Sequence, residues 1–263
     1  MTDIRRGTGR WRFWAAAGTY VVLLAGTNVP TPLYAGYERR FGFSPLVVTL
    51  VFAVYVAALI PSLLAAGPLS DAIGRRRVLI PAVALAVAGS AVFAAAGGTA
   101  WLFAARLLQG VALGTASGAV TAAMAELVPA GNRRRAAMVA AVSAVAGVGA
   151  GPLLGGLLAQ YAPDPDVLPY LVEVALLVLA GIAIVAMPEP AAAPGPAAEP
   201  GARSRWRPRR PQVPSAIRVA FARSGITSFL AWAVTALFLT LIPSYVASLA
   251  SSANLALGSA VVA

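Results

Sequence analysis

Two long stretches without a charged residue, 46–66 and 78–96, constrain the fold of this chain more than any other feature of its sequence. Each is long enough to cross the hydrocarbon core of a bilayer, about 30 Å thick, as a single helix. They are joined by a short polar segment, within 67–79, that contains an aspartate and three consecutive arginines. A polar segment between two spanning helices is expected to form a loop at a membrane surface.

The composition extends this conclusion to the whole chain. Of the 263 residues, 59% are hydrophobic and only 11% are charged, which cannot be arranged with a polar surface. We therefore predict an all-α, polytopic membrane protein in contact with the lipid bilayer. The chain has no cysteine and no histidine, so disulfides, thiolate zinc sites and Ser-His catalysis are excluded. Since no nucleophile-base pair or metal-ligand cluster is found, we predict no enzymatic activity, no cofactor and no metal site.

Arginine supplies all 20 basic residues, and the net charge is +11. Seventeen of these arginines lie in the N-terminal tail or in alternate loops, so the positive-inside rule predicts that the tail and those loops are cytoplasmic. This placement favours a multi-pass protein of the inner, or plasma, membrane over a protein that binds nucleic acid. The apolar run after the tail is too long for the core of a secretory signal and is expected to remain as a spanning helix.

The hydrophobic runs predict the domain organisation. After a cytoplasmic tail, 1–13, we expect a six-helix bundle over 14–187, with spanning helices at 14–34, 46–66, 78–96, 100–124, 136–160 and 168–187. A cytoplasmic linker, 188–224, follows: its Pro/Ala/Gly-rich first part cannot bury a core, and its arginine-rich second part is either a helix on the inner leaflet or an unstructured basic anchor. Residues 225–263 would hold a seventh helix, 226–249, and the start of an eighth.

Arg106 is an ionisable residue inside a predicted spanning helix, where it costs about 2.5 to 3.5 kcal/mol on insertion scales. Helical steps of three and four residues place Gln109 and the small residues Gly110, Gly114 and Gly118 on the same face. Another helix can pack closely on such a face, so we expect Arg106 to point into the bundle. The alternative is an arginine that snorkels to the outer surface.

Three further features of the helices concern function. The first helix contains the polar, proline-kinked sequence T-N-V-P-T-P at 27–32, whose freed carbonyls would be tolerated only where protein or water satisfies them. Glu173 lies either within the apolar zone, where it would be functional, or at the interface in water. A second small-residue seam at four-residue spacing, with a proline that bends the helix, consists of Gly147, Gly151, Pro152 and Gly155.

Three of these patterns resemble motifs of the major facilitator superfamily transporters. The sequence G-P-L-S-D-A-I-G-R-R-R-V-L at 67–79 is similar to motif A, R-L-L-Q-G at 106–110 to motif B, and the glycine seam at 147–156 to motif C of the proton-antiporter branch. The resemblance implies two six-helix lobes, each built from 3+3 inverted repeats, around a central cavity. It also implies proton-coupled efflux of drugs or small metabolites by alternating access.

The resemblance assigns roles to residues as follows. A cytoplasmic gate would use Gly67, Asp71, Gly74, Arg75 and Arg76. Coupling to a small-molecule substrate and to protons would use Arg106, Gln109, Asn28, Tyr34 and Glu173. The bend of the fifth helix would use Gly147, Gly151, Pro152 and Gly155. Plainer readings are a solvated turn for the first set and a packing seam for the last.

The sequence departs from the family pattern in three respects. Ala72 follows Asp71 where the family usually has a basic residue, and Asn28 stands where several drug antiporters carry an acid, which leaves the proton site in doubt. The chain also stops within its eighth predicted helix, as a truncated copy or one piece of a split transporter would. The remaining alternatives are a non-transporting membrane protein and a half-transporter that needs a homologous chain or a missing C-terminal half.

Overall fold

The computed structural model describes residues 2–128, 131–187, 215, 218–231 and 234. Within these residues the chain is helical and contains no strand, which confirms the predicted all-α class. A further helical segment covers 218–231. Most of the predicted linker, most of the seventh predicted helix and all of the eighth lie outside the described residues. The elements are α1 (Thr2–Asn28), η1 (Thr31–Leu33), α2 (Tyr34–Phe41), α3 (Pro45–Ile73), α4 (Arg75–Ala94), α5 (Thr99–Leu127), α6 (Arg133–Tyr161) and α7 (Leu168–Ala186).

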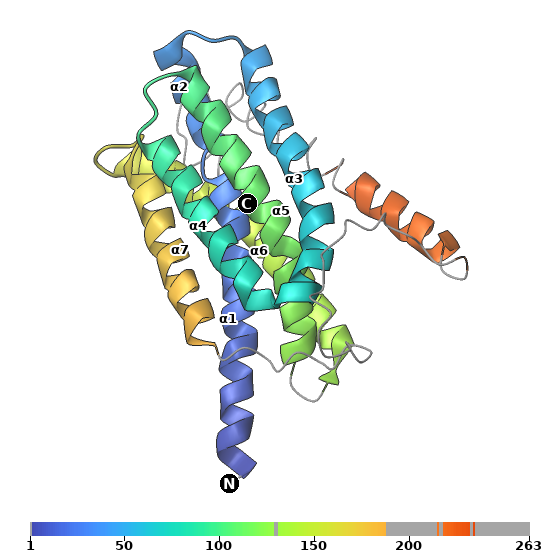
Figure 1. Ribbon diagram of the computed structural model, residues 1–263. Helices are drawn as coiled ribbons and strands as arrows, with labels where there is room; N and C mark the ends of the chain where they lie inside the picture. The colour runs from blue at the N-terminus through green and yellow to red at the C-terminus, as the bar shows by residue number, and fades with distance from the viewer. Residues whose placement is uncertain (1, 129–130, 188–214, 216–217, 232–233, 235–263) are drawn as a thin grey trace.

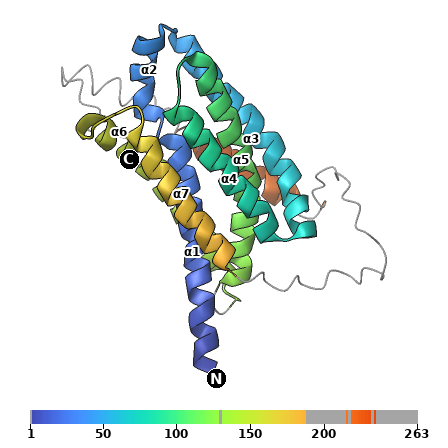
Figure 2. The ribbon, with the colours of Figure 1, turned by 60° about the vertical axis from the view of Figure 1, so that its left-hand side comes forward.

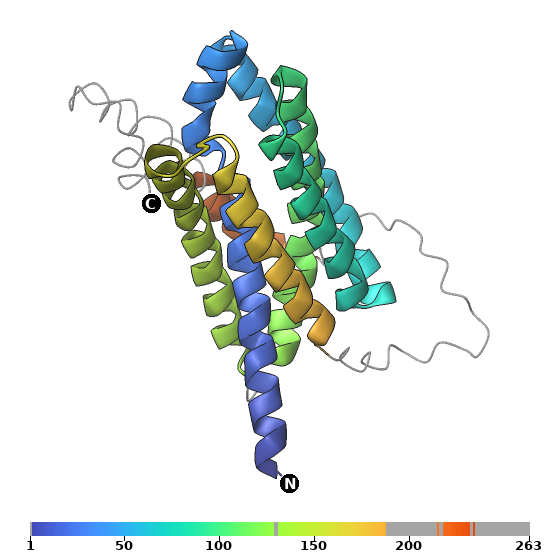
Figure 3. The same ribbon diagram turned by 90° about the vertical axis from the view of Figure 1, so that its left-hand side faces the viewer.

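The long helices run side by side as one elongated bundle (Figure 1). α5 packs against α3 on one side and α4 on the other, while α1 packs against α6, α5 and α7. Figure 2 shows α4 and α7 side by side, and the two helices are in contact. In Figure 3 the first part of α1 extends beyond the other helices at the lower end of the bundle. This is also the end at which α3 meets α4 and α5 leads into α6.

Five of the described helices, α3 to α7, are long and apolar enough to cross a membrane. The prediction of a multi-pass membrane protein is confirmed. α1 is not among the five, because only residues 13–28 of it are uncharged and these include polar residues. It is nevertheless part of the bundle, since Phe13, Ala16, Leu23 and Leu24 are buried in the core that it shares with α4, α5 and α7.

The first predicted helix, 14–34, was wrong in its end: α1 stops at Asn28, and the chain continues as the short helices η1 and α2. Pro30 has no N–H, so the carbonyl of Gly26 has no helical partner four residues on. Pro32 has the same effect on the carbonyl of Asn28. The backbone therefore leaves the α-helix here, with a last helical bond from the Val29 N–H to the Ala25 carbonyl at 2.9 Å.

The polar segment between α3 and α4 is not the loop that was predicted. α3 continues through Asp71 to Ile73 and α4 begins at Arg75, so Gly74 alone separates the two helices. Its φ of 101° lies in the region that favours glycine and reverses the chain in one step. The polar side chains of this segment are therefore held on two helix ends.

We also expected Gly67 to permit a close approach of backbones, and this expectation was wrong. A Cβ atom at Gly67 would meet nothing within 4 Å, because this face of α3 is open in the described residues. The close approach lies higher in the bundle. There, Gly110 and Gly114 of α5 face backbone carbonyls of α3, and Gly147, Gly151 and Gly155 of α6 face backbone carbonyls of α1.

Gly74 and Gly67 are expected to respond differently to replacement by alanine. Gly74→Ala forces a side chain into a strained backbone region and is expected to destabilise the protein by about 1 to 3 kcal/mol. Gly67→Ala should be close to neutral, since a Cβ there has open space. The midpoint of thermal unfolding in detergent, compared for both variants, measures the difference. Equal midpoints would contradict a strained reversal at Gly74.

Candidate functional site

Arg106 lies at the centre of a buried polar cluster and is completely shielded, with an exposed fraction of 0%. Its Nε donates to the hydroxyl of Tyr34 at 2.7 Å, and its Nη1 donates to the carbonyl of Thr27 at 2.6 Å. Nη1 also lies 3.1 Å from Oε1 of Gln109. Arg106 therefore points into the bundle as the glycine face predicted, and the snorkelling alternative is wrong.

Aromatic rings surround the charged group. The Cζ atom of Arg106 lies 4.7 Å from the ring centre of Phe52, 5.5 Å from those of Tyr34 and Tyr55, and 5.7 Å from that of Phe93. Ring faces attract a cation, and the attraction is stronger where water is excluded. The remaining nitrogen, Nη2, has no hydrogen-bond partner in the part of the chain that the structure describes. The cluster thus holds a buried positive charge with one free donor.

The break in α1 supplies the backbone acceptors of this cluster. Nε2 of Gln109 donates to the carbonyl of Gly26 at 3.2 Å, and this is the carbonyl that Pro30 leaves without a helical partner. The neighbouring carbonyl of Thr27 accepts from Arg106. Sequence reasoning named Arg106 and Gln109 but missed these acceptors. The missing N–H of Pro30 was the signal that could have identified Gly26.

Glu173 of α7 is also buried, with an exposed fraction of 3%. Its Oε1 accepts a hydrogen bond from Ser90 of α4 at 2.7 Å, while its Oε2 has no hydrogen-bond partner among the described residues. A Cβ atom on Gly26 would lie 2.8 Å from Cδ of Glu173 and still closer to Oε1, so the carboxyl rests directly on the α1 backbone. The interior position that was predicted as one of two alternatives is confirmed, and the interfacial position is wrong. Ser90 carried no signal in the sequence.

Tyr34 and Asn28 differ in what they contact. Tyr34, the first residue of α2, is buried and bonds Arg106. The side chain of Asn28 is half-buried and donates within its own helix, to the Leu24 carbonyl at 2.8 Å. A Cβ atom on Gly151 would lie 2.7 Å from that of Asn28, so Asn28 faces the seam between α1 and α6. The structure brings Tyr34, but not Asn28, into direct contact with Arg106.

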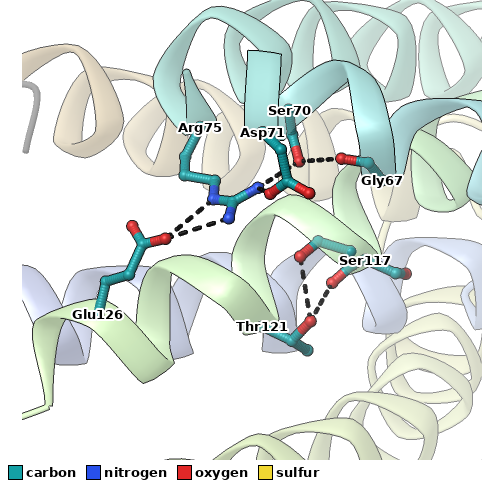
Figure 4. A network of polar contacts seen from close by, with 8 residues as sticks. Gly67, Ser70, Asp71, Arg75, Ser117, Thr121 and Glu126 are labelled. Carbon is teal, nitrogen blue, oxygen red and sulfur yellow. Dashed lines mark hydrogen bonds and ion pairs between the residues drawn. The ribbon is translucent and has the colours of Figure 1, made fainter. Parts of the chain in front are cut away.

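A second polar network lies at the end of the bundle where α3 meets α4 (Figure 4). The guanidinium of Arg75 donates to Ser70 at 2.6 Å, forms an ion pair with Asp71, and reaches Oε1 of Glu126 at 3.1 and 3.2 Å. Arg76 donates to the carbonyl of Met187 at 3.2 Å. The network joins α3, α4, α5 and the end of α7. Sequence reasoning missed Ser70, and it missed Glu126, which is 51 residues from Arg75 and meets it only in the folded bundle.

Contacts at the opposite end join α2 to α7 and to the turn before it. The hydroxyl of Tyr37 donates to that of Tyr170 at 3.0 Å, and the Tyr170 ring stacks on Phe93 with centres 5.1 Å apart. Arg40 forms an ion pair with Asp166 at 2.9 Å, with both side chains substantially exposed. Tyr170 lies one helical turn before Glu173. α2, which bonds Arg106 through Tyr34, is therefore also attached to the helix that carries Glu173.

Comparison with known proteins gives two findings. The sequence model of the family described as the Major Facilitator Superfamily matches residues 16–263. The chain is also 32% identical over 164 residues to "Putative multidrug resistance protein MdtD" of Escherichia coli O6:K15:H31. The same identity and span are found with the proteins of that name from Escherichia coli K12 and Shigella boydii serotype 18. Each match covers 62% of this chain and 34% of the relative, so the matching part spans about a third of the relatives' length.

Proposed function

Because this chain belongs to the Major Facilitator Superfamily, a family of membrane transporters, we propose that it serves proton-coupled efflux of drugs or small metabolites by alternating access. In such a mechanism two helical lobes rock about a site near the middle of the membrane. The relatives are named for multidrug resistance, which supports drugs as the substrate class. The family and the membrane-spanning helices also speak against an enzyme.

The observation that carries the proposal is the buried cluster around Arg106. A charge with no exposed surface inside a spanning helix is costly and is retained where it binds or couples something. Here the guanidinium has acceptors from three segments, α1, α2 and α5, and one nitrogen, Nη2, without a partner among the residues that the structure describes. We assign coupling of substrate and protons to Arg106, Gln109 and Tyr34. Asn28 would contribute at the edge of this site, beside α6.

The network of Arg75 supports a gate at the end of the bundle. Contacts of Arg75 and Arg76 join four helices there, and ion pairs near a protein surface contribute about 0 to 1 kcal/mol each. Such weak contacts can break and re-form as a lobe moves. A bend at Gly151 and Pro152, which we also propose, would let α6 follow α1 during that motion. We place this end in the cytoplasm, since it gathers arginines 75–77 and 133–135.

Transport by the full-length protein in proteoliposomes tests the proposal. An imposed proton gradient is expected to drive movement of fluorescent drug-like dyes such as ethidium, and a protonophore is expected to stop it. Liposomes without protein provide the background rate. The protein is tested with a panel of cationic, neutral and anionic dyes, with and without the gradient. If protein that is monodisperse and inserted in the membrane moves none of them, the proposal of drug efflux is wrong.

A further inference from the structure

We propose that Glu173 is the residue of this lobe that binds the transported proton, and that the broken end of α1 links its protonation to Arg106. The inference rests on the proposed function, since it specifies where the coupling ion binds. It departs from a proton site on the first helix, because Asn28 there cannot take up a proton at physiological pH.

The burial of acids within the described residues supports this assignment. Among them, Glu173 is the one carboxyl group in the buried set, and it lies within the spanning helix α7. The other acids whose side chains the structure describes are at positions 38, 71, 126, 164 and 166, and they lie at the two ends of the bundle. An acid that exchanges protons during transport has to be reachable from both sides in turn, and a position inside the bundle meets that requirement.

The immediate surroundings of Glu173 leave room for one proton. Ser90 donates to Oε1, so this oxygen already accepts a hydrogen bond. Oε2 is buried and, within the described ranges, has no hydrogen-bond partner, and it is the atom on which an O–H bond can form. The carboxylate would bind one proton there, become neutral, and return to the charged form when the proton leaves on the other side. No second reactant is needed for this step.

Few other groups within the membrane compete for the role. Among the described residues, Arg106 of α5 is the charged side chain with an electrostatic effect on Glu173. α4 from 78 to 94 and α6 from 136 to 160 contain no titratable residue. α1 contributes Tyr20, whose hydroxyl interacts with Ser117, while α2 and α7 contribute Tyr34, Tyr37 and Tyr170, whose hydroxyls are hydrogen-bonded. The two charges of the cluster are thus Glu173 and Arg106.

The end of α1 connects these two charges. The carboxyl of Glu173 rests on the Cα of Gly26, the carbonyl of Gly26 accepts from Gln109, and Oε1 of Gln109 contacts Arg106. Arg106 also bonds the next carbonyl, that of Thr27. When Glu173 binds a proton, the cluster changes from neutral to positive. The unbalanced charge then acts on the segment of α1 that the prolines have already released from helical bonding.

Infrared difference spectra of the full-length protein between alkaline and acidic buffer test the proton site without any substrate. A carbonyl band of a protonated carboxyl in apolar surroundings is expected in the wild type. It should disappear in Glu173→Gln, which keeps an acceptor for Ser90, and should persist in Glu38→Gln at the outer end. A band that persists in Glu173→Gln, or no such band in the wild type, would overturn the proposal.

Two glycines of α1 test whether the contact between Gly26 and the Glu173 carboxyl matters for the proton site. Gly26→Ala places a Cβ against the carboxyl and is expected to shift or remove the band, whereas at Gly18 a Cβ meets nothing within 4 Å and Gly18→Ala should leave it unchanged. Proton-driven dye transport is then measured on the same samples, with loss expected in Glu173→Gln. If the band depends on Glu173 but the wild type moves no dye, the proposed function fails and the proton site stands. If the wild type couples dye to protons and Glu173→Gln does so equally, the proton site fails.

Discussion

Arg106→Ala is expected to abolish efflux by the full-length protein, even in the fraction that reaches the membrane. The substitution removes the positive charge of the cluster together with its bonds to Tyr34 and Thr27 and its contact with Gln109. A buried polar group that loses its partner costs about 1 to 3 kcal/mol, so a lower yield of folded protein should accompany the loss of function. Efflux of dye from cells, normalised to the amount of protein in the membrane fraction, separates the two effects.

Two further variants separate the charge of Arg106 from its geometry. Arg106→Lys keeps a positive charge but not the planar fork that reaches acceptors on three segments, so efflux should stay low. Arg40→Ala removes an exposed ion pair with Asp166, at the end of the bundle opposite the Arg75 network, and should leave efflux close to the wild-type rate. Wild-type efflux by Arg106→Ala would rule out its role in coupling. Full activity of Arg106→Lys would show that charge alone is required.

Gly114→Ala is expected to destabilise the bundle strongly. A Cβ atom there would lie 2.9 Å from Cβ of Ser62 and closer still to the carbonyl oxygen of Leu59. The carbonyl belongs to the backbone of α3 and cannot rotate away, so α3 and α5 would have to separate. Forcing extra atoms into a packed interface typically costs about 1 to 3 kcal/mol, and backbone contacts lie at the upper end of that range.

Gly118→Ala is the matched control for this prediction. Gly118 lies on the same face of α5, one helical turn further on, and a Cβ there would be 3.9 Å from Cα of Gly67, an ordinary contact. In detergent, the thermal unfolding midpoint of Gly114→Ala should be well below that of the wild type, and its size-exclusion profile should show less monodisperse protein. Gly118→Ala should match the wild type in both measurements. Similar midpoints for the two variants would mean that the interface between α3 and α5 can open without cost.

Several features of the fold followed from local sequence. Uncharged runs predicted most of the ends of α3 to α7 to within a few residues. They could do so because the length of apolar sequence needed to cross a bilayer is a local property. The four-residue spacing of glycines predicted both helix seams, and the face shared with Gly110 and Gly114 predicted that Arg106 points inward. The end of α1 was predicted wrongly, although the prolines responsible were recognised as a kink.

The distribution of polar and apolar residues along the chain by itself determined that this protein is an all-helical, multi-pass membrane protein. The spacing of its glycines determined which helix faces can pack closely against another helix. Only the tertiary structure decided that Glu173 is buried, that Ser90 and Gly26 hold it, and that Glu126 joins Arg75. The physical reason is distance along the chain. Ser90 and Glu173 are separated by 83 residues, and so are Gly26 and Gln109. No sequence motif or helical spacing links such partners. They meet only because the packing of glycine faces fixes the position of each helix along its neighbours.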